Sequence, residues 1–150
     1  MEKRVETSLH ELTDLQMFVN EIDKAYGSRV AYKYFVKDHI IDKTFSELSR
    51  DVRSIASWMV RKNHYGKHIA IIGSTSYQWI TTFLGITCSG NVVLPIDKML
   101  SRNEILNIFC LGDVDMVFGS SEFEDLLQDI EQDEARNVEV IRLDGNDFQE

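Results

Sequence analysis

Three polar side chains stand where an open α/β sheet would bind a ligand. Ser74 and Ser76 follow the apolar run 68–73, and Asp97 follows the apolar run 92–96. Ligands of such sheets bind outside the carboxyl ends of the strands, so we expect these residues on the ligand face. Hydroxyls and backbone amides near a helix N-terminus suit an anion such as phosphate. The pattern therefore makes Ser74, Ser76 and Asp97 the candidate ligand-face residues.

The same residues also fit a purely structural role. The loop that contains Ser74 and Ser76 runs directly into the bulky residues 77–79, so the glycine that would let a backbone approach a phosphate is missing. Asp97 and Lys98 fit a solvated loop before a helix cap at Ser101. Helix capping is the favoured interpretation, and we assign no catalytic and no cofactor-binding residue.

Histidines and cysteines give no metal site. His64 and His68 have helical metal-ligand spacing, but Gly66 between them indicates a loop, and no third ligand is near in the sequence. Cys88 and Cys110 have no metal-ligand spacing and lie among apolar residues. We predict two buried free thiols rather than a disulfide.

Composition excludes several classes of function. The formal net charge of −9 argues against nucleic acid or an anionic membrane as the main partner. The first residues lack the apolar core of a signal peptide. The uncharged stretch 69–96 is broken by glycine and polar residues, so it does not predict a transmembrane helix. We expect a cytoplasmic protein. The chain also lacks the glycine-rich phosphate loops of the P-loop and dinucleotide-binding classes.

The elements that would position these residues begin with a helix and a hairpin. A capping pattern predicts a first helix from Thr13, and Ser46 is expected to cap a second helix that ends near Lys62. Two extended runs between these helices, 30–36 and 40–45, predict a β-hairpin.

From residue 68 onward, strands and helices alternate. The expected strands are HIAIIG (68–73), VVLPI (92–96), VDMVFG (114–119) and VEVIRL (138–143), and the expected helices cover 76–90, Ser101 to about Leu111, and a segment capped by Ser121 and Glu124. Apolar strands that alternate with helices predict a parallel sheet with helices on both faces. Analogy with doubly wound sheets gives the strand order 2-1-3-4. We predict one α/β domain over 1–150: a helix and hairpin followed by a Rossmann- or flavodoxin-like sheet.

The only proline, Pro95, lies inside an expected strand. Its position near the carboxyl end of that strand reduces the cost of the missing backbone donor. Gly90 or Asn91 is expected to end the preceding helix in a left-handed conformation.

Two segments, taken in order, resemble the N-terminal region of the adenylate-forming enzymes, the family of acyl-CoA synthetases, luciferases and peptide-synthetase adenylation domains. KTFSEL (43–48) is similar to the family's first core motif, an aromatic-x-Glu-Leu that opens a helix. GITCSGNVVLPID (85–97) is similar to its second motif, and the run between them matches a strand, a polar turn and a Trp-containing helix. The resemblance covers roughly residues 13–145 and is closest to bacterial long- or medium-chain fatty-acyl-CoA synthetases. Thr75 and Ser76 replace the Asn-Ser pair that is usual in that turn.

This resemblance implies a parent enzyme that joins a carboxylate, here a fatty acid, to coenzyme A through an acyl-adenylate, with ATP and Mg²⁺. Members hold ATP with a Ser/Thr/Gly-rich loop that ends in Pro-Lys-Gly, and a C-terminal domain supplies a lysine. This chain contains neither, and Ile96 follows its only proline. We therefore expect an incomplete N-terminal portion that binds no cofactor or metal and is inactive by itself. Its partner would be the remainder of the parent, and surface left uncovered would favour self-association.

Two other functions stay open on the residues alone. A standalone flavodoxin-like module would bind a phosphate or nucleotide through residues 74–76. An interaction domain would recruit a basic partner through the acidic stretch 122–134, although this stretch also fits the solvated face of an amphipathic helix.

Overall fold

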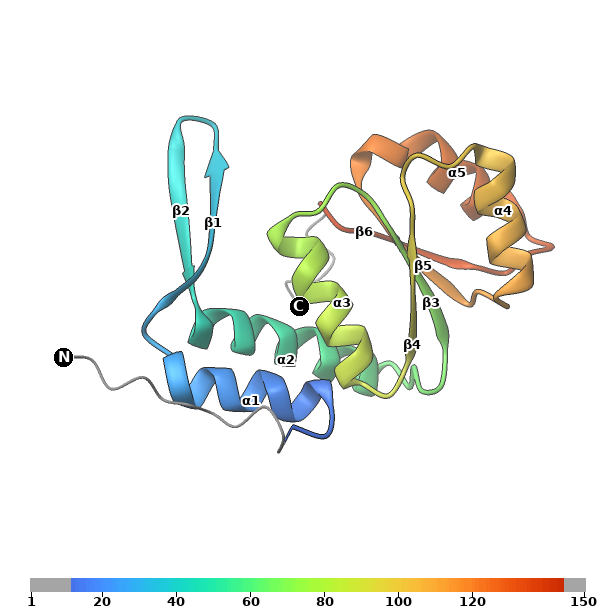
Figure 1. Cartoon of the computed structure of the whole chain (residues 1–150). Helices are drawn as coiled ribbons and strands as arrows, with labels where there is room; N and C mark the ends of the chain where they lie inside the picture. The colour runs from blue at the N-terminus through green and yellow to red at the C-terminus, as the bar shows by residue number, and fades with distance from the viewer. Residues whose placement is uncertain (1–11, 145–150) are drawn as a thin grey trace.

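A helix and a hairpin precede a four-stranded parallel sheet in the computed structural model, which describes residues 12–144 (Figure 1). In chain order the elements are α1 (Leu15–Tyr26), β1 (Val30–Val36), β2 (His39–Thr44), α2 (Phe45–Arg61), β3 (His68–Ile72), α3 (Tyr77–Cys88), β4 (Val92–Ile96), α4 (Arg102–Leu111), β5 (Met116–Gly119), the 3-10 turn η2 (Ser121–Phe123), α5 (Glu124–Gln132) and β6 (Glu139–Arg142). The predicted α/β class is confirmed.

The sheet has the order β4-β3-β5-β6, and all its neighbouring strands are parallel. This is the predicted order 2-1-3-4. Alternate residues of the central strand β3 enter two separate cores: Ile69 and Ile71 pack with α2 and α3, whereas Ala70 and Ile72 pack with α4 and α5. A strand that is buried on both faces must be apolar at every position, which explains the continuous apolar run.

Pro95 is tolerated chiefly because β4 is an edge strand within the described sheet. It lies opposite Ile71 of β3, and β4 has no second neighbour among the described strands. A proline on an edge strand removes no ladder hydrogen bond on its open side. Gly90, at φ 78°, takes the left-handed conformation, whereas Asn91 does not.

The first two helix starts differ from the prediction. Asp14, not Thr13, caps α1, and its carboxylate accepts a hydrogen bond from the Met17 amide at 2.7 Å. Thr44, not Ser46, caps α2 through a reciprocal capping box with Glu47. Ser46 has a serine three residues later, so it cannot form that reciprocal pair.

The cap of α4 is confirmed, and the predicted cap of the last helix is wrong. Ser101 and Glu104 form a capping box. Ser121 instead begins the 3-10 turn η2, and α5 starts at Glu124 without a side-chain cap. The Ser121 amide, which a capping box with Glu124 would use, donates instead to Asp144 at 2.8 Å, and the Glu124 carboxylate binds Arg142 at 2.8 Å.

One cysteine prediction fails. Both cysteines are free, as predicted, but only Cys88 is partly buried, and Cys110 is exposed. Cys110 lies on the solvent-facing side of α4, whose apolar side chains Ile105 and Phe109 face the core. Among residues 12–144, no helix combines the length and the apolar character needed to cross a bilayer.

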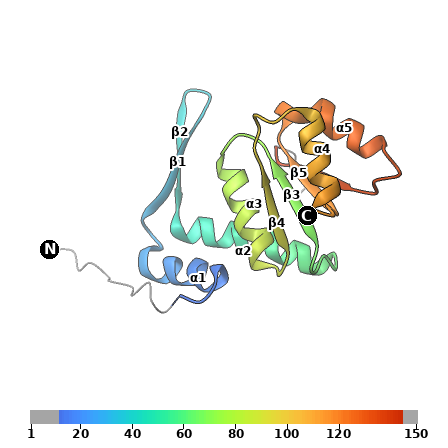
Figure 2. The same ribbon diagram turned by 45° about the vertical axis from the view of Figure 1, so that its right-hand side comes forward.

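The hairpin β1–β2 projects away from the sheet, as Figures 1 and 2 show from two directions. One face of β1 is held by aromatic contacts: the ring of Tyr34 stacks on Tyr77 of α3 at 5.8 Å between centroids, and Tyr32 contacts Tyr77 at 5.7 Å. Towards the tip, Phe35 is 75% exposed and Ile40 is 60% exposed. Phe35 alternates with Tyr32 and Tyr34 along β1 and is paired with Ile40, so one face of the hairpin is anchored on α3 and the opposite face leaves apolar side chains uncovered.

Candidate functional site

Four polar residues meet where β3, β4 and β5 end. Ser74 follows β3, Lys98 follows β4, and Ser120 and Glu122 follow β5. The Glu122 carboxylate accepts hydrogen bonds from the Ser74 amide, from the Ser74 hydroxyl at 3.2 Å and from the Ser120 hydroxyl at 3.0 Å. Lys98 Nζ donates to Ser74 Oγ at 2.7 Å. We call these four residues the carboxyl-edge cluster.

The cluster favours a negative charge at its centre. The hydrogen bond from the Ser74 amide is the main cause that lowers the pKa of Glu122, followed by the bond from the Ser120 hydroxyl. Lys98 adds a smaller electrostatic contribution in the same direction. Glu122 is therefore ionised at neutral pH, and all the groups that contact its carboxylate are donors.

Gly73 allows the two loops of the cluster to approach. Its φ is 152°, a value that L-residues rarely adopt, and a Cβ there would lie 2.5 Å from Ser120 Oγ. A larger residue would separate the β3 loop from the β5 loop.

The predicted ligand-face residues all follow the ends of β3 or β4, but only Ser74 joins the cluster. Ser76 caps α3 by accepting a hydrogen bond from the Trp79 amide at 3.1 Å. Asp97 accepts a hydrogen bond from the Met99 amide at 2.9 Å within its own loop. These contacts are the local roles that the structural interpretation favoured.

Sequence reasoning missed Ser120 and Glu122 as ligand-face residues, because the helical pattern places Glu122 on a solvated helix face. A usable signal is present in the sequence, since Gly119-Ser120 follows β5 in the same way that Gly73-Ser74 follows β3. A small polar pair after two neighbouring parallel strands indicates that two loops meet at one edge.

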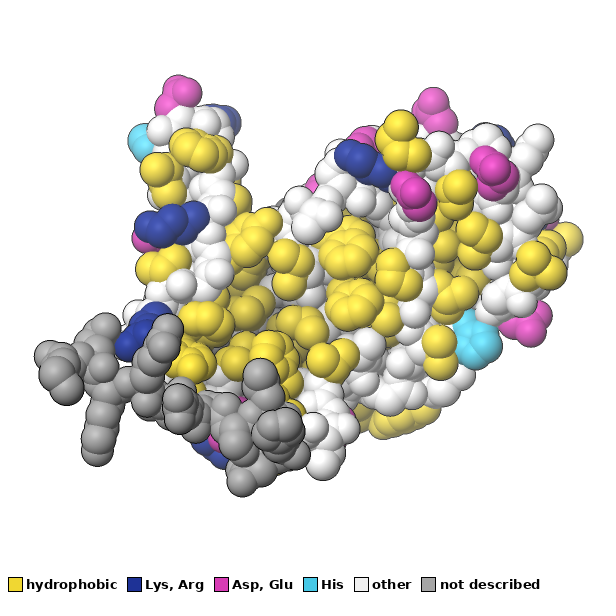
Figure 3. Space-filling model, in the orientation of Figure 1, with side chains coloured by type: hydrophobic (Ala, Val, Ile, Leu, Met, Phe, Trp, Pro, Cys, Tyr) yellow, Lys and Arg dark blue, Asp and Glu magenta, His cyan; other side chains and the backbone are white. Residues whose placement is uncertain are grey.

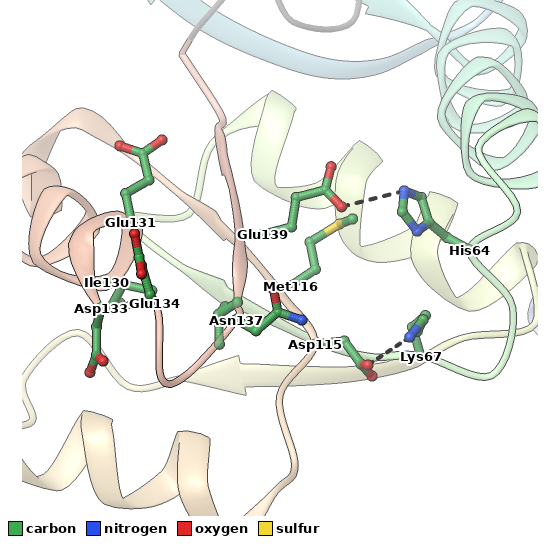
Figure 4. A pocket seen from close by; sticks show the side chains of 11 residues that line it. His64, Lys67, Asp115, Met116, Ile130, Glu131, Asp133, Glu134, Asn137 and Glu139 are labelled. Carbon is green, nitrogen blue, oxygen red and sulfur yellow. Dashed lines mark hydrogen bonds and ion pairs between the residues drawn. The ribbon is translucent and has the colours of Figure 1, made fainter.

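The opposite, amino edge of the sheet holds a pocket of about 450 Å³ (Figure 4). Lys67 Nζ lies 2.8 Å from Asp115, and His64 Nε2 lies 3.6 Å from Glu139. Partial burial opposes ionisation of Asp115, but hydrogen bonds from Lys67 and from the His68 amide outweigh it and lower its pKa. Lys67 and Asp115 directly precede β3 and β5, and Glu139 begins β6. The two ion pairs therefore link the amino ends of these strands to one another and to the loop after α2.

A larger groove of about 830 Å³ lies between the hairpin, α2, α3 and the end of β6. Tyr77 lines it and donates a hydrogen bond to Asp51 at 2.8 Å. Burial, followed by this hydrogen bond, raises the pKa of Tyr77 above its ordinary range. Its hydroxyl therefore stays protonated and serves as a structural donor rather than as a general base.

The acidic segment 122–134 already has basic partners within the chain. Glu124 and Glu131 both bind the Arg142 guanidinium, and Asp129 pairs with Arg102. These internal pairs reduce the charge available to an external basic partner, which weakens the interaction-domain hypothesis.

The described residues form no metal site built from protein side chains alone. Within residues 12–144, no group of three or more His, Cys, Asp or Glu side chains is arranged to hold a metal ion. The sequence also has no Ser/Thr/Gly-rich loop that ends in Pro-Lys. We therefore derive no chemical step from the residues of this chain.

Comparisons with known proteins agree on one family and one fold. The profile described as "AMP-binding enzyme" matches residues 20–150. A D-alanine--D-alanyl carrier protein ligase of Streptococcus pyogenes is 24% identical over 102 residues, which make up 67% of this chain and 20% of that protein. The crystal structure of an anthranilate CoA ligase in complex with anthranoyl-AMP has a TM-score of 0.73 at 19% identity and covers 91% of this chain and 27% of that chain. A fatty acyl-adenylate ligase from L. pneumophila, in complex with acyl adenylate and pyrophosphate, has a TM-score of 0.72 at 14% identity and covers 93% of this chain and 25% of that chain.

Proposed function

Because the chain belongs to the family of AMP-binding enzymes, we propose that it is the N-terminal part of an ATP-dependent carboxylate ligase that forms an acyl-adenylate. The family match over residues 20–150 carries this proposal. The chain spans about a fifth of the length of the curated relatives it matches, so the activity, substrates and cofactors proposed here are those of a longer protein.

The proposed reaction solves a problem of reactivity. A carboxylate is a poor electrophile because its negative charge repels nucleophiles. Attack of the carboxylate on the α-phosphate of ATP releases pyrophosphate and gives an acyl-adenylate, from which a thiol displaces AMP. The thiol would belong to coenzyme A or a carrier protein, and Mg²⁺ would neutralise phosphate charge. We place the enzyme in the cytoplasm, where ATP and coenzyme A are available.

For the substrate we propose a fatty acid. The resemblance of segments 43–48 and 85–97 to bacterial fatty-acyl-CoA synthetases supports this choice, as does the name of the L. pneumophila relative. Two other relatives are named for D-alanine and for anthranilate, so the substrate classes to compare are fatty acids, aryl acids and amino acids.

The 150 residues by themselves are proposed to be one incomplete domain without catalytic activity. Their role would be to supply a rigid sheet against which the remainder of the enzyme packs. Apolar side chains gather over α3 and β4 and along the hairpin on the face shown in Figure 3. Trp79, Phe83 and Val93 are only partly buried there, and Phe35 is 75% exposed on the hairpin. We expect the isolated chain to self-associate through such surfaces, which sedimentation velocity would detect.

The test is acid-dependent exchange of labelled pyrophosphate into ATP. The protein encoded by the complete reading frame is compared with the 150-residue chain, using a fatty acid, benzoate, anthranilate and D-alanine as separate substrates. We expect exchange with the complete protein and the fatty acid, and none with the short chain. Exchange with only an aryl acid or D-alanine would overturn the substrate proposal. Exchange by the short chain would overturn its assignment as inactive, and tight FMN binding by it would favour the flavodoxin-like hypothesis.

A further inference from the structure

The Glu122 side chain places an anion inside a ring of hydrogen-bond donors. Its carboxylate accepts from the Ser74 amide, the Ser74 hydroxyl and the Ser120 hydroxyl, and Lys98 is bound to the same Ser74 hydroxyl at 2.7 Å. Three donors to the carboxylate, with a cation bound to one of the donor hydroxyls, also match the needs of a phosphate group. We propose that the carboxyl-edge cluster is a phosphate-binding site and that Glu122 fills it in the absence of ligand.

The donors are not required by the helix that follows them. Ser76 caps α3 with its own side chain, so the amide and hydroxyl of Ser74, two residues earlier, are left for other partners. The donors come from two loops and the cation from a third, and Gly73 allows the two donor loops to meet. A helix cap would not need groups from three separate loops, whereas a binding site is built from such groups.

A ligand could reach the cluster, and Glu122 could leave it. Ser74, Lys98 and Glu122 are all exposed. Glu122 lies in the single turn η2, which is held by a backbone hydrogen bond from Phe123 to Ser120 at 2.9 Å. That bond does not involve the Glu122 side chain, so a rotamer change would free the donors without unfolding the turn.

The neighbouring carboxylates are bound elsewhere. Asp97 accepts a hydrogen bond from the Met99 amide at 2.9 Å, and Asp144 accepts one from the Ser121 amide at 2.8 Å. Glu122 is therefore the carboxylate that would compete directly with a ligand for the three donor groups. Removing its charge should expose a site whose nearest charged group is the Lys98 ammonium.

The experiment is a titration of the 150-residue chain with inorganic phosphate, followed by the backbone amide signals of Ser74 and Ser120 in NMR spectra. It compares the unchanged chain with Glu122→Ala, Glu122→Gln and the control Glu134→Ala, which removes an exposed glutamate in the turn after α5. We expect saturable shifts at both amides in the two Glu122 variants, with an affinity at least about tenfold above that of the unchanged chain. The control should bind phosphate no better than the unchanged chain.

A second pair of variants tests the donors themselves. In the Glu122→Ala background, Lys98→Met and Ser120→Ala should each weaken phosphate binding by about tenfold.

If either folded Glu122 variant shows no saturable shift at Ser74, the proposal is overturned, and the cluster only holds the two loops together. An equal gain in the Glu134→Ala control would also overturn it, because the effect would then reflect overall charge. Glu122→Gln nearly preserves side-chain volume and keeps the test valid if the alanine variant does not fold. The outcome is independent of the ligase proposal, since no ATP or acid substrate is used.

Discussion

The two edges of the parallel sheet carry polar networks of different construction. At the amino edge, Asn91 and Asp115 bond backbone groups: Asn91 accepts from the Lys67 amide at 2.9 Å and donates to the His64 carbonyl at 3.0 Å, and Asp115 accepts from the His68 amide at 2.8 Å. At the carboxyl edge, Glu122 accepts from one backbone amide, that of Ser74, and the remaining bonds join side chains at an exposed site. The comparison indicates that the first network stabilises the fold, whereas the second can change without unfolding it. A binding site is therefore better accommodated at the carboxyl edge.

The largest expected effect is on the backbone that carries the carboxyl edge. Gly73→Ala should lower the free energy of unfolding by about 2–3 kcal/mol, because alanine is strained at this φ and its Cβ would collide with the Ser120 side chain. Urea unfolding measures this change in the free energy of unfolding, and Gly66→Ala is the control. Gly66 has a left-handed φ of 61°, but no neighbouring atom lies within 4 Å of the position that an added methyl group would take. Gly66→Ala should therefore lose less stability than Gly73→Ala. Equal losses would show that close approach of the two loops is unimportant.

Asn91→Ala should have the next largest effect and tests the amino edge directly. Asn91 is 8% exposed, and loss of its side chain leaves the Lys67 amide and the His64 carbonyl without this partner. We expect a decrease of about 2 kcal/mol in the free energy of unfolding. The matched control is Asn107→Ala, an exposed position on α4. A decrease no larger than that of the control would contradict a stabilising amino edge.

Asp115 should make the amino edge sensitive to acid. Its folded-state pKa is lowered, so its ionised form contributes stability above its unfolded-state pKa of about 3.9, and this contribution is lost as the pH falls through the folded-state value. The difference in unfolding free energy between the unchanged chain and Asp115→Asn should be constant above about pH 5 and should narrow below about pH 4. Urea unfolding at several pH values measures the difference. If the difference in unfolding free energy between the two proteins does not change with pH, ionised Asp115 does not stabilise the amino edge.

The smallest expected effect is that of Glu122→Gln on stability. Glu122 is exposed, and its hydroxyl and amide partners can bond water after the substitution. The urea midpoint should match that of the control Glu134→Ala. A large decrease would remove the distinction between the two edges and would make the carboxyl-edge cluster a stabilising element.

Local patterns predict the elements of the sheet but not the contacts at its edges. The apolar runs at 68–73 and 114–119 reflect burial on both faces, which a local pattern records directly. The helical pattern misplaces Glu122 because its contact with Ser74 joins residues that are 48 positions apart. The role of Ser46 is also non-local, because its hydroxyl donates to Asp23 of α1 at 2.6 Å rather than capping α2. Contacts between distant loops depend on the sheet order and are invisible to periodicity.

The family resemblance succeeds for a related reason. The segments 43–48 and 85–97 combine a capping box, a helix end and an edge strand, so their residues are fixed by structure rather than by one substrate. They identify the fold and the family, which the match over residues 20–150 confirms. They do not identify the acid, because the residues that would contact it lie outside this chain in the proposal.

The most direct test of the central claim is to determine the reading frame of the source gene beyond the codon for Glu150. We expect the frame to continue and to encode a Ser/Thr/Gly-rich loop that ends in Pro-Lys, a motif that the 150 residues do not contain. A stop codon directly after Glu150 would contradict the account, because the chain would then be a complete protein without the groups needed to form an acyl-adenylate.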